Sequence, residues 1–358
     1  MITSNPYVGP RTFGRHEADR FFGREREARD LFSLVVAERV VLFYAQSGAG
    51  KSSLLNTRLI PQLQEEAQYL VLPVGRVGGE LQKGIEDVAN IYVFNLLLSI
   101  NQDSANQTTD PSRFAQMEIK EFLTGLYTAD GEHYFYDEKV AQQTITEAPQ
   151  PQNQPPHVLI IDQFEEIVTT HLHRWQDRND FFHQLDEAIK DDPNLWVVLT
   201  LREDFVAALE PYARLVSGGL RTRFYMERLD VAAAIEAVRR PAAELGDRSF
   251  AAGVAEALVN NLRRIRVHGS DSTGLGQYVE PVQLQVVCYQ LWESIAQQPV
   301  GPIQMADLQG AGDVDQALAT FYEDSLKAVL AEPTVAVSER QLRTWFDNKL
   351  ITEAGTRG

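Results

Sequence analysis

The residues best suited to chemistry follow a short apolar run at 40–44, and they read Ala45-Gln46-Ser47-Gly48-Ala49-Gly50-Lys51-Ser52-Ser53. A loop with two glycines can turn its amide groups toward a phosphate, while the helix that follows directs its positive end at the same charge. Lys51 would reach the β- and γ-phosphates, and the Ser52 hydroxyl would bind Mg²⁺. Ala45 stands where a glycine is usual, and its side chain is small enough for the turn. The pattern predicts a P-loop that binds a nucleoside triphosphate with Mg²⁺.

A second group of candidate residues follows the apolar run at 158–161. Asp162 ends this run and is expected to hold the magnesium ion through its water shell. If the next residues begin a helical turn, Glu165 and Glu166 lie within about 60° of the direction of Asp162, and either could activate an attacking water. The alternative is an acidic first turn that satisfies a helix dipole.

The apolar run at 195–199 carries a third group at its end. The carboxyl ends of parallel strands line the ligand crevice, so Thr200 and Arg202 are expected to face the γ-phosphate. An arginine there would sense phosphate by its charge and its fork of N–H donors. The alternative is a surface ion pair between Arg202 and an acidic neighbour such as Asp204.

The elements that must position these residues alternate between strands and helices. Apolar segments at 40–45, 69–74, 158–162 and 195–200 read as strands that are buried on both faces. Such strands predict an α/β fold, with a parallel sheet between two layers of helices. A Pro/Gln tract at 149–156 ends a polar stretch, and we expect a disordered insert near 141–156.

From Asp230 the pattern changes to helices alone. Asp230 can cap the first of them, a second is expected from about 251 to 266, and a third follows Pro281. Beyond about 303 we expect a helix at 313–331 and another that opens with the capping box at 338–341. A strand start at 350–352 then precedes Gly358, so we expect a small domain that is cut short. The predicted domains are 1–229, 230–302 and 303–358.

Composition limits the class of protein. The formal net charge of −17 disfavours non-specific binding of nucleic acid, although it leaves room for a local basic patch. The single cysteine, Cys288, excludes an internal disulfide and a cysteine-based zinc site. The N-terminus lacks a basic, apolar leader, and no segment reaches the ~20 apolar residues of a membrane span. We expect a cytoplasmic protein that is not integral to a membrane.

These segments together resemble the bacterial STAND NTPases, and within them the group called novel STAND NTPase 1, relatives of the NACHT and NB-ARC ATPases in the AAA+ branch. The resemblance rests on Gly23-Arg24-Glu25-Arg26-Glu27, the P-loop, 160–166, Leu199 to Arg202, Ala234-Ile235 with Arg240-Pro241-Ala242, and Glu280 to Leu284.

The resemblance implies a P-loop NTPase core followed by a helical lid at 230–302 and the start of a winged helix at 303–358. It implies ATP or ADP with Mg²⁺ as ligands, and it places Phe22, Gly23 and Arg24 by the adenine together with Pro281. Gln163 occupies the position of the catalytic glutamate in many AAA+ proteins, which implies slow hydrolysis. Related motifs end in an acidic residue at position 166, which favours Glu166 over Glu165 as the base.

The resemblance also implies a nucleotide-operated switch in signal transduction or antiviral defence. ADP would hold it closed as a monomer, with the nucleotide between the α/β core and the lid, and ATP with a trigger would open and oligomerise it. The trigger and the sensor or effector modules are unknown. Arg221 and Arg223 are either an arginine finger that acts in trans or a solvated basic turn.

Two other functions use the same core. An origin-recognition-like AAA+ DNA-binding ATPase is the main alternative, but the net charge and the absence of a basic recognition helix at 338–350 argue against it. A small-molecule kinase would need an acceptor pocket, and no basic or acidic cluster in the helical region suggests one.

Overall fold

The computed structural model describes residues 5–81, 84–85, 87–101, 110–128, 130–131, 133–147, 155–266, 273–311, 314–332 and 337–345. The chain divides into two compact units, Thr12–Leu229 and the pair of segments Met1–Arg11 and Asp230–Gly358. We had assigned 1–229 to one domain, whereas the first segment belongs to the second unit. The reason is Tyr7, which is buried and donates a hydrogen bond to the Val238 carbonyl at 2.5 Å.

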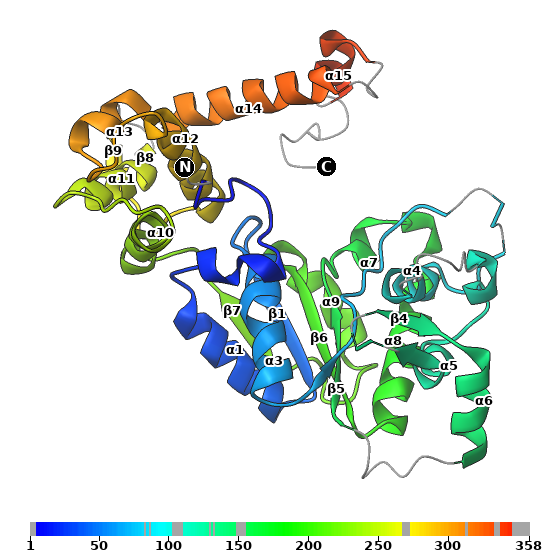
Figure 1. The fold of residues 1–358 in the computed structure, drawn as a ribbon. Helices are drawn as coiled ribbons and strands as arrows, with labels where there is room; N and C mark the ends of the chain where they lie inside the picture. Colours follow the sequence, from blue (N-terminus) through cyan, green and yellow to red (C-terminus); the bar gives the residue numbers. More distant parts are fainter. Residues whose placement is uncertain are drawn as a thin grey trace. The chain divides into compact units, whose positions relative to one another are not determined.

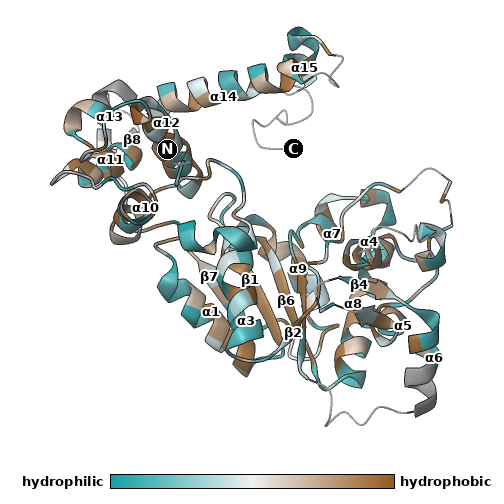
Figure 2. Ribbon diagram, in the orientation of Figure 1, coloured by the Kyte–Doolittle hydropathy of each residue, from teal (hydrophilic) through white to brown (hydrophobic). Residues whose placement is uncertain are grey.

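The unit Thr12–Leu229 is built on a parallel sheet with the strand order β2-β5-β6-β1-β7 (Figure 1). The predicted α/β fold with a parallel sheet is confirmed. Figure 2 shows these strands as largely hydrophobic, which is typical of a sheet covered on both faces. The five strands are β1 (Val40–Ala45), β2 (Leu70–Val71), β5 (His157–Ile161), β6 (Leu195–Arg202) and β7 (Arg223–Met226).

Helices cover both faces of this sheet. Alternate strand residues such as Leu159 and Leu199 belong to one core with Tyr92 and Phe182 from the covering helices. Their strand neighbours point to the opposite face because side chains alternate along a strand. The helices are α1 (Glu25–Ala37), α2 (Lys51–Leu54), α3 (Ile60–Glu65), α4 (Ile91–Ile100), α5 (Ile119–Thr124), α6 (Glu138–Glu147), α7 (Glu166–Thr169), α8 (Gln176–Asp191) and α9 (Val206–Ala213), with a π-helical segment, Leu55–Leu59, between α2 and α3.

The region between α4 and β5 contains regular secondary structure. Helix α5, the hairpin of β3 (Leu126–Thr128) and β4 (Tyr134–Tyr136), and α6 pack together, and Phe122 stacks on Tyr136 with 5.9 Å between ring centroids. The first part of the predicted disordered insert near 141–156 lies in α6, and its disorder stays a prediction. The remainder up to 154 lies outside the described residues.

The second unit is helical, as predicted from Asp230 onward, and Asp230 caps its first helix by accepting from the Ala233 amide at 2.8 Å. The predicted helix to residue 266 ends instead at Leu262, and β8 (Arg264–Arg266) follows, paired antiparallel with β9 (Thr273–Leu275). The helices are α10 (Val231–Glu244), α11 (Val254–Leu262), α12 (Pro281–Ile295), α13 (Met305–Ala311), α14 (Val314–Ala331) and α15 (Glu339–Trp345).

The predicted capping box at the start of α15 is confirmed. The Gln341 amide donates to the Ser338 hydroxyl at 3.4 Å, and the Ser338 amide donates to the Gln341 side chain at 2.9 Å. The strand expected at 350–352 lies outside the described residues, so the winged helix stays a prediction.

Candidate functional site

The P-loop connects β1 to α2. Its glycines adopt left-handed backbone angles, with φ of 75° at Gly48 and 97° at Gly50. No atom lies within 4 Å of the point that a side chain at Gly50 would occupy, so the backbone angle and not crowding requires glycine there. The loop therefore curls at the first turn of α2, as a phosphate-binding loop must.

Lys51 is the first residue of α2, and its amino group lies over the loop. It donates to the carbonyls of Ala45 at 3.3 Å and Gln46 at 3.4 Å. Burial lowers the pKa of Lys51, and the nearby carboxylates of Glu165 and Asp162 partly oppose this. A half-buried cation held by two neutral carbonyls is suited to receive an anionic phosphate.

Asp162 lies directly after β5 and is buried. Its carboxylate accepts a hydrogen bond from the Ser52 hydroxyl at 2.6 Å and another from the Thr200 hydroxyl. The Gln163 amide also donates to it at 2.9 Å. Asp162 and the P-loop serine, which the sequence predicted as the two magnesium residues, therefore lie in contact.

The sheet topology explains this meeting. Strand β6 lies between β1 and β5, so Ala45 at the end of β1 is beside Arg202, and Ile161 at the end of β5 is beside Leu199. All three strands are parallel, and their carboxyl ends meet at one edge. Residues that are over a hundred positions apart, such as Ser52 and Asp162, are brought together only at this edge.

Glu165 points into this site. Its carboxylate accepts from the Arg202 amide at 3.2 Å, and it interacts electrostatically with Lys51 and Asp162. Burial raises the pKa of Glu165, although the hydrogen bonds and the charge of Lys51 act in the opposite direction. A half-buried carboxylate with a raised pKa is a suitable acceptor for a proton from water.

Glu166, the residue expected to be the base, has partners outside the group formed by Lys51, Asp162 and Glu165. Its carboxylate forms an ion pair with Arg76 and accepts from the Gly78 amide at 2.8 Å. The separation of the two glutamates starts at Gln163, which has a left-handed φ of 53° and interrupts the helical turn on which the prediction rested. Helix α7 begins only at Glu166.

Arg76 is a residue that the sequence reasoning missed. It follows β2, and it binds both Glu166 and the side chain of Gln163. A side chain at Gly78 would clash with the Glu166 carboxylate, which explains the glycine beside this pair. The sequence could have indicated Arg76, because it follows a predicted strand and is therefore expected at the same edge of the sheet as Asp162.

Arg202 adopts the surface pairing that was the alternative reading. Its guanidinium forms an ion pair with Asp204 at 2.7 Å and lies 5.3 Å from the centre of the Phe205 ring. Its buried Nε has no hydrogen-bond partner among the residues described. Contact between Arg202 and a γ-phosphate stays a prediction.

The segment before α1 supports the loop. Arg24 is buried, and its guanidinium donates to the Ala49 carbonyl at 3.2 Å and to the Glu227 carbonyl at 2.8 Å. Phe22 is buried beside it, Gly23 has a left-handed φ of 81°, and Ser53 accepts from the Phe13 amide at 3.2 Å. Arg24 therefore holds the P-loop through its backbone, and contact of this segment with adenine stays a prediction.

The remaining candidates are placed as follows. Pro281 is the first residue of α12 in the second unit, and its predicted contact with the nucleotide stays a prediction. Arg223 pairs with Glu210 at 2.5 Å, whereas the Arg221 side chain is exposed. Within the described ranges, no helix is long and apolar enough to cross a membrane.

The site fits Mg²⁺ by the chemistry of its donors. The hydroxyl of Ser52 and the carboxylate of Asp162 present oxygen atoms, which are the ligands that Mg²⁺ prefers. Magnesium keeps several waters and uses few protein ligands when phosphates are present. Among the residues that the structure describes, no three Asp, Glu, His or Cys side chains are grouped so that they could hold a metal ion by themselves.

Comparisons with known proteins agree with this geometry. The family model described as Novel STAND NTPase 1 matches residues 6–346. No curated protein matches the sequence.

Three solved structures resemble the fold. A Walker-type ATPase of Pyrococcus abyssi is 16% identical, with a TM-score of 0.47, over 96% of this chain and 80% of that chain. Drosophila ORC bound to DNA is 13% identical, with a TM-score of 0.50, over 99% of this chain and 73% of that chain. The Aeropyrum pernix ORC2 protein, solved in ADPNP-ADP complexes, is 14% identical, with a TM-score of 0.50, over 93% of this chain and 81% of that chain.

At these identities the two structures with a TM-score of 0.50 support the fold alone. The family match covers nearly the whole chain and includes every element of the site at the edge of the parallel sheet. The chain belongs to the novel STAND NTPase 1 family.

Proposed function

We propose that this NTPase is an ATP-operated switch that hydrolyses ATP slowly and depends on Mg²⁺. The observation that carries the proposal is the contact of Asp162 with both Ser52 and Thr200. It joins the phosphate-binding loop, the acidic strand end and the intervening strand in one polar cluster. Lys51 stands over the same loop and supplies the positive charge that phosphates require.

Each residue has a defined task in this proposal. When bound, Mg²⁺ would neutralise phosphate charge, and Ser52 and Asp162 would hold it. Lys51 would bind the β- and γ-phosphates, and the amides of the loop would orient them. Glu165, in place of the Glu166 that we first favoured, would orient water and accept its proton.

Slow hydrolysis follows from the residue after Asp162. Gln163 carries an amide that cannot take up a proton, and its side chain is bound by Arg76. The base must then come from a residue further along the chain. We infer that the protein spends most of each cycle with nucleotide bound, as a switch requires.

Two substitutions test the nucleotide site. Lys51→Ala should abolish ATP binding. Asp162→Asn should lower ATP affinity and turnover in the presence of Mg²⁺ by roughly 10- to 100-fold, because the gain that Mg²⁺ produces is lost. Chelation of Mg²⁺ with EDTA should reproduce the Asp162→Asn result in the unchanged protein. Lys190→Ala is the matched control, since Lys190 is an exposed lysine that pairs with Asp186 in α8.

Calorimetric titration with ATP gives the affinities, and phosphate release gives the turnover. Circular dichroism establishes that each variant is folded. Full ATP affinity in a folded Lys51→Ala variant would remove the basis of the proposal.

The switch itself requires a separate experiment. We propose that this chain is a monomer with ADP and that ATP with an unknown trigger produces a homo-oligomer, in signal transduction or antiviral defence in the cytoplasm. The net charge of −17 supports the monomer, because identical subunits repel one another. Light scattering of the purified chain, with chromatography of the nucleotide released on denaturation, tests this. A stable ring without ATP would favour a constitutive assembly.

DNA binding is the less favoured function. The ORC neighbours share the fold at identities of 13% and 14%, and the charge of this chain is unfavourable for phosphate backbones. Fluorescence anisotropy with duplex DNA at low and physiological salt distinguishes the two functions. Tight binding that persists at physiological salt would support the origin-recognition-like alternative.

A further inference from the structure

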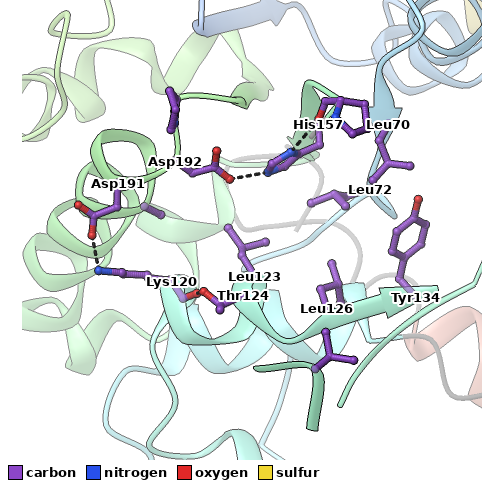
Figure 3. A pocket seen from close by; sticks show the side chains of 14 residues that line it. Leu70, Leu72, Lys120, Leu123, Thr124, Leu126, Tyr134, His157, Asp191 and Asp192 are labelled. Carbon is purple, nitrogen blue, oxygen red and sulfur yellow. Dashed lines mark hydrogen bonds and ion pairs between the residues drawn. The ribbon is translucent and has the colours of Figure 1, made fainter. Parts of the chain in front are cut away.

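A cavity that is partly open to solvent lies at the opposite edge of the sheet from the P-loop. It has a volume of 430 Å³, and it is lined by residues of α5, the β3-β4 hairpin, the end of α8 and the first residues of β2 and β5 (Figure 3). This volume falls within the range of about 300–1,000 Å³ that is usual for small-molecule sites. All of its walls belong to the unit Thr12–Leu229.

The cavity is separate from the nucleotide site. His157 lines it at the first residue of β5, whereas Asp162 follows the last residue of the same strand. Five residues of extended chain separate them, which corresponds to roughly 16 Å at about 3.3 Å per residue. A ligand here would therefore not occupy the place of ATP.

The ionisable side chains of the cavity wall are paired with one another. Figure 3 shows Lys120 paired with Asp191, and His157 paired with Asp192 at 2.9 Å between Nε2 and Oδ2. Every ionisable residue among the described lining, Tyr134 apart, is in one of these two pairs. Leucines form much of the remaining wall, and they are Leu70, Leu72, Leu123 and Leu126. Such a wall favours an uncharged molecule with an apolar body.

One polar group in the wall has no partner. The side chain of Tyr134 lines the cavity and is only 3% exposed, yet its hydroxyl makes no hydrogen bond with any residue that the structure describes. Burial raises the pKa of Tyr134, so the hydroxyl keeps its proton and can donate it. A buried donor without an acceptor is unfavourable, and a ligand oxygen would relieve that cost.

We propose that this cavity binds a small uncharged molecule, whose apolar body contacts the leucines and whose single oxygen acceptor receives the Tyr134 hydroxyl. The site goes beyond the proposed ATPase function and gives the NTPase core a second ligand. Its ligand class differs from a nucleotide, because no unpaired cation is present in the wall to bind phosphate.

The dye Prodan provides a direct test, because it is an uncharged naphthalene with one carbonyl group and its emission shifts to the blue in apolar surroundings. The unchanged protein should bind it saturably at one site. Tyr134→Phe should weaken the affinity for Prodan roughly threefold to tenfold, which is the effect expected from the loss of one neutral hydrogen bond. Tyr127→Phe is the matched control, since Tyr127 lies on the neighbouring strand β3 and is 42% exposed.

A second pair of variants tests the location. Leu123→Trp should fill the cavity and abolish saturable binding, whereas Leu172→Trp adds the same ring at an exposed position and should leave binding unchanged. Retained ATP affinity shows that the Leu123→Trp variant is folded. Equal Prodan affinities in the two tyrosine variants, or saturable binding in a folded Leu123→Trp variant, would overturn the proposal.

Discussion

Thr200 donates its hydroxyl hydrogen bond to the carboxylate of Asp162, from the strand that lies beside β5 in the sheet. Both residues are buried, and the same carboxylate accepts from Ser52 of the P-loop. The orientation of the acidic group toward the nucleotide site therefore depends on a neutral residue of the neighbouring strand.

Replacement of Thr200 by valine should expose this dependence. Valine has nearly the same shape, but it removes a donor to a buried charge, so we expect the free energy of unfolding to fall by about 2 kcal/mol. Mg²⁺-dependent turnover should fall as well, because Asp162 loses one of its two hydroxyl partners. Urea denaturation and phosphate release measure the two effects.

Thr124→Val is the control for that experiment. The Thr124 hydroxyl donates a solvent-exposed hydrogen bond to the Lys120 carbonyl within its own helix, so its loss should change stability little. Equal losses of stability in the two threonine variants would contradict the role given to Thr200.

The two adjacent glutamates should behave differently. Glu165→Gln should leave ATP bound but slow its hydrolysis roughly 10²- to 10⁴-fold, the usual contribution of a general base. Glu166→Gln should affect turnover much less, because its carboxylate pairs with Arg76 and lies away from Lys51. Single-turnover hydrolysis with bound ATP measures the chemical step. A larger loss in the Glu166 variant would restore our first expectation.

The pH dependence of hydrolysis should also identify Glu165. Burial raises the pKa of this carboxyl above 4.5, so we expect turnover to fall on the acid side with a midpoint above that value. The base must be ionised to accept a proton, and a raised pKa keeps it protonated to higher pH. A pH–rate profile with its acid midpoint at or below 4.5 would exclude Glu165 as the base.

The same shift has a consequence for stability. The folded protein holds the Glu165 proton more tightly than the unfolded chain does, and this difference adds to the free energy of unfolding. The contribution is fully present below pH 4.5 and is lost as the pH rises through the folded-state pKa of Glu165. Glutamine resembles the protonated acid at every pH. Glu165→Gln should therefore raise the urea midpoint relative to the unchanged protein at pH 7, with a smaller gain below pH 4.5.

Arg24 should be intolerant of lysine. The guanidinium reaches two carbonyls in different segments, Ala49 of the P-loop and Glu227 after β7, and a lysine has no fork of donors to bridge them. We expect Arg24→Lys to lower the free energy of unfolding by about 3 kcal/mol and to weaken ATP binding.

Arg26→Lys provides the comparison, since Arg26 is 86% exposed and faces only Asp30 at 3.7 Å. Urea denaturation and ATP titration of both variants complete the test. Unchanged ATP affinity in the Arg24 variant would show that the P-loop does not depend on this contact.

The sequence by itself determined the elements of the site that depend on local pattern. The glycines and Lys51 mark a loop between strand and helix, and an apolar run that ends in Asp162 marks a buried strand with a carboxylate at its end. These features are readable because backbone angles and burial on both faces of a sheet restrict the residue types that can occur. The parallel sheet followed from the same restriction.

Only the tertiary structure separated the partners of the two glutamates. The separation depends on the left-handed backbone of Gln163 and on Arg76, which follows a different strand and forms an ion pair with Glu166. A helical turn assumed from adjacent residues could not include that distant partner. The unpartnered hydroxyl of Tyr134 was equally hidden, because a missing hydrogen bond is a property of everything packed around the group. Contacts between segments far apart in the chain leave no periodic pattern within either segment, and so they appear only when the chain is folded.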